Sequence, residues 1–106
     1  MNVLDHDYEV STGEVRNVKV SLDPILDAGE TASSGTVAEQ FSSDLTLGSV
    51  AAGAAADTIR GRSVATGRWV QFSVQGSVAG RHYEILLSVT TSDSQTLKMV
   101  VAFDGV

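Results

Sequence analysis

The sequence contains no cysteine, which excludes a disulfide framework, a thiolate zinc site and a cysteine nucleophile. Proline and tryptophan each occur once, and there are two histidines among the 106 residues. No apolar run approaches the roughly 18 residues that a membrane-spanning helix requires, so we expect no membrane contact. The first residues lack the basic and apolar segments of a secretory signal peptide, and none is expected. A chain of this size that lacks these features is expected to form one domain.

Positive charge is also scarce, since seven basic residues face thirteen acidic ones and give a net charge of -6. Residues 1–57 contain ten acidic and two basic residues (net -8), whereas residues 58–106 contain three acidic and five basic residues (net +2). An acidic chain binds nucleic acid poorly because affinity for phosphate comes from Lys and Arg. The uneven charge leaves two interpretations open, a solvated acidic face or charge-complementary docking between copies or onto a partner.

Residues that favour β-strands are abundant, with 15 Val, 3 Ile and 9 Thr in the chain. Residues 83–90 and 96–103 alternate between apolar and more polar side chains around the polar turn at 92–94. This period of two in adjacent runs predicts a β-hairpin with a strongly apolar inward face. The C-terminal part of the chain is therefore expected to supply much of the core.

Shorter patterns predict further strands. They lie at residues 17–22, around 36–38, at 45–47, at 59–64 and at 69–74. The alanine-rich stretch 49–57 contains a glycine and has no apolar stripe, so we expect an inter-strand loop or one helical turn there. About seven short strands with turns every 8–12 residues are typical of an antiparallel β-sandwich, with a small barrel as the alternative. We expect residues 1–14 to form an extended N-terminal arm that a partner orders, and residues 15–106 to form the sandwich.

Two aromatic residues suggest an immunoglobulin-like (Ig-like) variant of the sandwich. Tyr83 begins a long alternating strand after Gly80, as in a tyrosine corner, where the hydroxyl group folds back onto upstream backbone. Trp69 is expected to be the buried aromatic residue that packs across the two sheets. The fold class that we expect is all-β, with a single Ig-like antiparallel sandwich that lacks the usual disulfide.

A search for catalytic and metal-binding patterns finds little. Asp5, His6 and Asp7 form the one local group of metal-ligand types, but neighbours in an extended arm point to alternating sides. We expect no metal there and place these residues, together with Tyr8, in a docking arm. A catalytic role for His82 would need a nucleophile and an orienting acid, and no glycine-rich phosphate loop is present. We therefore expect that the protein is not an enzyme and binds no cofactor.

Three arginines in the C-terminal half suggest a small basic patch, which either serves solubility or meets the acidic arm or face of a neighbouring copy. Two glycines are expected at tight turns because they tolerate backbone conformations that other residues avoid. The predicted partner contacts are Asp5, His6, Asp7, Tyr8, Arg60, Arg62 and Arg68, and the predicted structural residues are Trp69, Tyr83, Gly29 and Gly80.

Two stretches of the chain resemble a known family. Residues 23–34, DPILDAGETASS, resemble the segment D-P…L-x-x-G-D/E-T-I-x-S-S of small proteins encoded in tailed-phage structural gene clusters. Residues 76–83, GSVAGRHY, and 90–96, TTSDSQT, resemble that family's ending G-G-x-A-G-x-x-Y…T-T-S-x-G-R-T. The family is that of the phage fiber–tail adaptor proteins, which have an Ig-like β-sandwich, and the similarity spans about residues 18–106. A Trp-rich stretch of the family is missing here, and its Gly-Gly and Gly-Arg pairs are Gly-Ser and Ser-Gln.

The resemblance implies a non-enzymatic structural protein of a tailed-phage virion, made in the bacterial cytoplasm, that connects fibers or spikes to the tail. Its partners would be tail adaptor or nozzle proteins and fiber or spike proteins, and several copies would contact one another as a homo-oligomer. One alternative is a capsid decoration or cement protein that binds the major capsid protein. A more distant alternative is an Ig-like module that binds carbohydrate or a cell surface.

Overall fold

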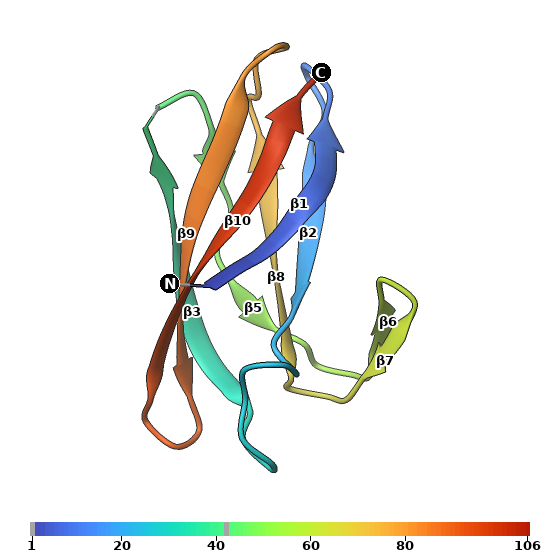
Figure 1. The fold of residues 1–106 in the computed structure, drawn as a ribbon, viewed down its shortest axis with the longest axis vertical. Coiled ribbons are helices and arrows are strands. Elements are labelled where there is room, and N and C mark those ends of the chain that lie inside the picture. Colours follow the sequence, from blue (N-terminus) through green and yellow to red (C-terminus); the bar gives the residue numbers. More distant parts are fainter. Residues whose placement is uncertain (1, 42) are drawn as a thin grey trace.

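The computed structural model describes residues 2–41 and 43–106, with the backbone alone for residues 2–9. Every regular element in these residues is a β-strand, and Figure 1 shows their arrangement. The strands are β1 Asn2–Val10, β2 Arg16–Ser21, β3 Ala32–Gln40, β4 Thr46–Leu47, β5 Ala51–Ala52, β6 Asp57–Ile59, β7 Arg62–Val64, β8 Trp69–Gln75, β9 His82–Thr91 and β10 Thr96–Gly105. The predicted all-β class is confirmed.

The longer strands form two sheets. The first has the order β1-β10-β9-β3, and the second has the order β2-β8-β4 with β5 also paired to β8. The short β6 and β7 form a separate hairpin that projects from the side of the molecule in Figure 1. Most pairings are antiparallel, but β1 runs parallel to β10. Within the described residues, no helix is long and apolar enough to cross a membrane.

The inward faces of the two sheets meet in one hydrophobic core. The predicted hairpin is confirmed, because β9 and β10 pair from Thr90↔Thr96 to His82↔Asp104. Alternation along each strand sends every second side chain inward. The buried residues of the core include Tyr83, Ile85, Leu87 and Val89 of β9, Met99, Val101 and Phe103 of β10, Val18 and Val20 of β2, and Val70, Phe72 and Val74 of β8.

The single strand predicted at residues 59–64 is wrong, because the chain reverses in the middle of it. Ile59 ends β6 and Arg62 begins β7, so only Arg60 and Gly61 lie between the two strands. Both turn residues have positive φ, 54° for Arg60 and 78° for Gly61. Two such residues in succession are typical of the tight turn that best matches the twist of a hairpin. The usual sequence signal for such a turn is Asn-Gly or Asp-Gly. Here arginine occupies the first position, so the sequence did not indicate a turn.

Trp69 is buried, with 5% of its surface exposed, but it does not pack between the sheets as predicted. It contacts Ile59 and Val64 in a second, smaller cluster under the β6–β7 hairpin. The reason is strand alternation, since β8 points its even-numbered side chains into the core and its odd-numbered ones outward. The indole Nε1 donates a hydrogen bond to the carbonyl of Ala55 at 2.8 Å. Gly53 makes room for the ring, because a Cβ there would lie 2.1 Å from it.

Tyr83 makes the contact that defines a tyrosine corner. Its hydroxyl oxygen accepts a hydrogen bond from the backbone N–H of Val78 at 2.8 Å and donates one to Asp44 at 3.0 Å. The ring stacks on Phe103 with 5.3 Å between centroids, and burial raises the pKa of the hydroxyl group. The corner therefore fastens the loops after β3 and β8 to the start of β9.

The N-terminal segment lies on the edge of the first sheet, where β1 pairs with β10 of the same chain. The boundary expected at residue 14 falls in the turn between β1 and β2. The expectation that a partner orders residues 1–14 stays a prediction.

We predict that Tyr83→Phe lowers the free energy of unfolding by about 1 kcal/mol, because the part-buried hydrogen bonds of the hydroxyl group to Val78 N and Asp44 are lost while the ring remains. Denaturant unfolding of the variant and the wild type measures the difference. Equal midpoints and equal slopes would contradict a stabilising role for the hydroxyl group.

Candidate functional site

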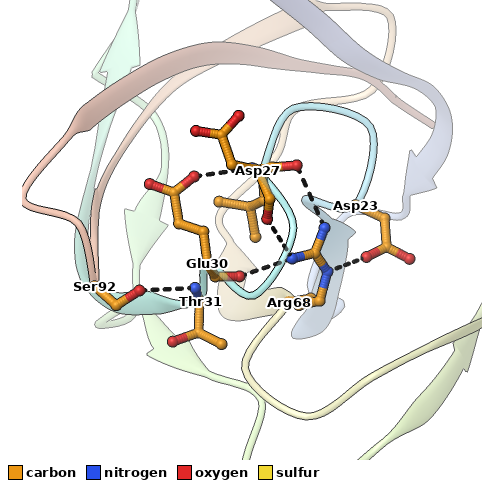
Figure 2. A network of polar contacts seen from close by, with 7 residues as sticks. Asp23, Asp27, Glu30, Thr31, Arg68 and Ser92 are labelled. Atoms are coloured by element: carbon orange, nitrogen blue, oxygen red, sulfur yellow. Dashed lines mark hydrogen bonds and ion pairs between the residues drawn. The ribbon is translucent and has the colours of Figure 1, made fainter.

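The loop between β2 and β3 is fastened by a single arginine. Arg68 precedes β8, and its side chain is 18% exposed. Its Nε donates to the carboxylate of Asp23, and its Nη1 donates to the carbonyls of Asp27 at 2.9 Å and Glu30 at 2.8 Å. Figure 2 shows the guanidinium group pointing into the loop between these acceptors. A planar group with five donors suits this task, because it satisfies several carbonyls from one position.

Glu30 fastens the same loop to the end of β9. Its side chain is 1% exposed, yet both carboxylate oxygens have partners. One accepts the backbone N–H of Asp27 at 3.0 Å and the other accepts the hydroxyl group of Thr91. These hydrogen bonds, with that to Thr91 the stronger influence, lower the pKa of Glu30 below its ordinary value. Beside it, Ser92 N donates to the Thr31 carbonyl at 2.7 Å. Thr31 N in turn donates to the side-chain hydroxyl group of Ser92 at 3.0 Å (Figure 2).

These contacts bring together the sequence segments 23–34 and 90–96, which are about sixty residues apart in the chain. Residue 32 of β3 also pairs with residue 91 of β9 in the sheet. Gly29 has a φ of 79° with open space around its Cβ position, so the turn conformation alone requires glycine there. Gly80, in the loop before β9 at the other end of the sheets, likewise has a φ of 84° and open space around its Cβ position. The two segments therefore form one structural unit at one end of the sheets, which we call the Arg68–Glu30 lock.

Three carboxylates gather at this unit, with oxygens of Asp27, Glu30 and Asp93 within 4.8 Å of one another. Both oxygens of Glu30 already accept hydrogen bonds from the protein, and Gln95 donates to one oxygen of Asp27 at 3.4 Å. We assign no metal to this group.

A cationic groove lies between β2 and the β6–β7 hairpin. It consists of two adjoining hollows of about 410 and 310 Å³ that share Lys19, Ile59 and Arg60. The basic residues that line it are Arg16, Lys19, Arg60 and Arg62. Lys19 pairs with Asp57 at 2.7 Å, and this contact lowers the pKa of the Asp57 carboxyl group. The sequence pattern had not grouped Arg16 and Lys19 with the hairpin arginines, because strand pairing alone brings β2 beside them.

An apolar end forms where β1, β3, β8 and β10 finish. The large hydrophobic residues that are exposed in the described side chains are Val15, Phe41, Val78 and Val106, and each follows or connects one of these strands. Phe41 is 88% exposed and has a φ of 66°, which is rare for a bulky residue. Exposed apolar residues gathered at one end are typical of contact surfaces. The sequence analysis did not predict this apolar end. The signal that could have indicated it is that several of the loops each contain an apolar residue.

The predicted contact residues fall in separate places. Arg60 and Arg62 share the cationic groove, whereas Arg68 is occupied inside its own chain and does not complete a patch with them. The side chains predicted to dock from the N-terminal arm lie outside the described part of the structure. They are Asp5, His6, Asp7 and Tyr8, whose backbone belongs to β1.

No protein-family model, no curated protein and no solved structure matches this chain.

We predict that Arg68→Lys lowers the free energy of unfolding by about 2–3 kcal/mol, because an ammonium group cannot reach all the carbonyls and the carboxylate that the guanidinium group satisfies. The matched control is Arg62→Lys in the exposed hairpin, for which a change within about 0.5 kcal/mol is expected. Thermal and urea unfolding measure both. Equal losses in the two variants would show that Arg68 is not a lock.

We predict that the protein loses stability in acid and that Glu30 accounts for part of the loss. The pKa of Glu30 in the folded state lies below its ordinary value of 4.5, so the unfolded state binds the proton more readily. The stabilising contribution is therefore complete above about pH 4.5 and disappears as the pH falls through the folded pKa. Urea unfolding between pH 3 and pH 7 should show a shallower pH dependence for Glu30→Gln, and an unchanged dependence would contradict this role.

Proposed function

We propose that this chain is a non-enzymatic structural subunit of a tailed-phage virion, an adaptor that connects fibers or spikes to the tail, and that its two sheets form an Ig-like sandwich. One observation carries the proposal. Two of the three ranges that resemble the phage fiber–tail adaptor proteins, residues 23–34 and 90–96, meet in space and are joined by the hydrogen bond from Thr91 to Glu30.

The individual residues of the resembling segments support this interpretation. Asp23 accepts from Arg68, and Glu30 accepts from Thr91. Next to that pair, Ser92 N donates to the Thr31 carbonyl, and Thr31 N donates to the Ser92 hydroxyl group. A chance likeness between two short segments gives no reason for them to touch. Here Asp23, Glu30 and Thr91 of the pattern each have a defined partner, as expected for a pattern that maintains a particular fold.

The Ig-like assignment rests on the same kind of evidence. Two sheets enclose a single core, and Tyr83 folds its hydroxyl group back onto the backbone of Val78. The arrangement differs from the expected seven strands, since β6 and β7 form an additional hairpin and β4 and β5 are each two residues long. The loops at the two ends of such a sandwich are the usual places for contacts with other proteins.

The surfaces of the chain suit an assembly part. The cationic groove and the apolar end are different regions, so contacts made through them between copies would be heterologous and would build a ring when the rotation closes. A subunit of this kind needs no cofactor. Its partners in the proposal are tail and fiber or spike proteins together with further copies of itself.

The exposed aromatic surface favours assembly over sugar binding. Sites for sugars usually display several aromatic faces, and among the described aromatic side chains Phe41 alone is exposed. The others are Trp69, Phe72, Tyr83 and Phe103, which are all buried.

We predict that purified particles of the phage that encodes this chain contain it in many copies. Quantitative mass spectrometry of the particles, with the major capsid protein as the reference, measures the copy number. Immunogold labelling should place it at the tail. Label over the head would instead indicate a decoration protein, and absence from particles would refute a virion role.

A further inference from the structure

The strand β1 is attached to the domain in an unusual way. It lies at the edge of its sheet, where it pairs with β10 alone and runs parallel to it. The register shifts twice within nine residues, between Val3 and Asp5 and between Asp5 and Tyr8. Parallel pairs are slightly less stable per residue than antiparallel ones, and each irregularity leaves ladder groups unpaired. Regular pairing in β1 is therefore confined to its two ends.

The edge of β10 needs a covering strand. The residues from Met99 to Phe103 are buried in succession, with no more than 6% of any side chain exposed. If β1 left, the N–H and C=O groups of a long apolar strand would face solvent, which is the typical template for pairing with another chain. In this structure the edge is covered by a parallel strand in the register of β1, and the same strand of another copy has the sequence needed to cover it.

The connection between β1 and β2 has the properties of a hinge. Residues 11–15 form a turn that closes on itself, with Glu14 N donating to the Ser11 carbonyl and Ser11 N donating to the Glu14 carboxylate, both at 2.9 Å. Two bonds tie it to the body, from Thr12 N to the Val106 carbonyl at 3.1 Å and from Ser77 Oγ to the Ser11 carbonyl at 3.4 Å. At its start, the carbonyl of Val10 accepts from Val106 N at 3.0 Å and from Ser77 Oγ at 2.9 Å. Gly13 has a φ of 84°, and Val15 is 63% exposed. When extended, five residues span about 17 Å, so opening the turn would let β1 leave its own domain.

We infer that β1 is an exchangeable strand, which in an assembly of copies lies on β10 of a neighbouring copy in the register that it has here on its own. The occupant is a second copy of this chain because both parts of the contact, β1 and the β10 edge, belong to the same sequence. When β1 moves to a neighbouring copy, the β1–β10 pairing lost in one copy forms again between copies. The free-energy cost of exchange therefore comes from opening the hinge and from association. The inference rests on the proposed function only in assuming that several copies meet in one assembly.

The absence of cysteine allows a direct test with two single variants. Glu9 and Asp104 are register partners in β1 and β10, and directly paired positions lie within the Cα separation that a disulfide spans. Glu9→Cys in one tagged copy and Asp104→Cys in an untagged copy are mixed at equal concentration, incubated at high total concentration and oxidised. Exchange predicts a disulfide-linked heterodimer whose yield is at least several times that of either homodimer.

A matched control pair comes from the interior of the sheet. Ser88→Cys and Lys98→Cys are register partners in β9 and β10, which form a hairpin that cannot exchange without unfolding. Mixing these two variants should give no excess of heterodimer. The inference is overturned if the mixture of Glu9→Cys and Asp104→Cys gives no more heterodimer than the control pair. This holds even if the protein forms oligomers, because they would then be joined by another contact, such as the edge of β3.

Changing the hinge gives a second test that does not depend on cysteine. Deleting Thr12 and Gly13 leaves too little chain for β1 to turn back, so the variant should be dimeric or larger by light scattering, with the strand content of the wild type by circular dichroism. Inserting Gly-Ser after Gly13 should favour the monomer. A deletion variant that remains a folded monomer would refute exchange. Particle mass spectrometry tests the virion role separately, so the protein can be present in particles even if exchange is refuted.

Discussion

The fold depends on satisfying the polar backbone of the loop that carries the chain from one sheet to the other. Residues 22–31 leave β2 in the second sheet and enter β3 in the first, and the loop carbonyls that turn inward need donors. Arg68 supplies them from the start of β8, and Glu30 binds the end of β9, so one polar unit joins strands of both sheets. Without it, the two layers would share apolar contacts but have no fixed relation at this end. The tyrosine corner performs the same task at the opposite end, where Tyr83 joins the loops after β3 and β8.

The apolar core and the polar contacts at the ends of the sheets together hold the fold without disulfides or proline-rich turns. The core is filled mainly by aliphatic and aromatic side chains on the inward faces of the strands, which fixes the register of each strand but leaves the crossing loops undetermined. Hydrogen bonds from a few buried polar residues then determine the loops. Three distinct surfaces remain for contacts: a cationic groove beside the β6–β7 hairpin, the edge strand β1, and an apolar end around Phe41 beside the tyrosine corner. An adaptor that contacts unlike partners needs such separate surfaces.

The sequence predicted the parts of the fold that depend on periodicity. The burial of β9 alternates along the strand, and Tyr83 has a recognisable position near its start, whereas β10 is buried on both faces from Met99 to Phe103. What could not be predicted depends on pairing over long distances. The role of Arg68 depends on carbonyls about forty residues away in the sequence. The groove forms because β2 lies beside the β6–β7 hairpin. The outward position of Trp69 depends on which face of β8 meets the core. The hairpin turn at Arg60 and Gly61 was missed because its first residue is not a usual turn former.

Residues 23–34 and 90–96, two of the segments that resemble the phage family, form one interlocked unit, and the hydrogen bond from Thr91 to Glu30 joins them most directly. A double-mutant cycle with Glu30→Gln, Thr91→Val and the double variant measures this coupling from the free energies of unfolding at neutral pH. The account predicts that the double variant loses clearly less stability than the sum of the two single losses, since the second substitution removes a partner that is already unpaired. Additive losses would contradict it, because the two segments would then stabilise the fold independently.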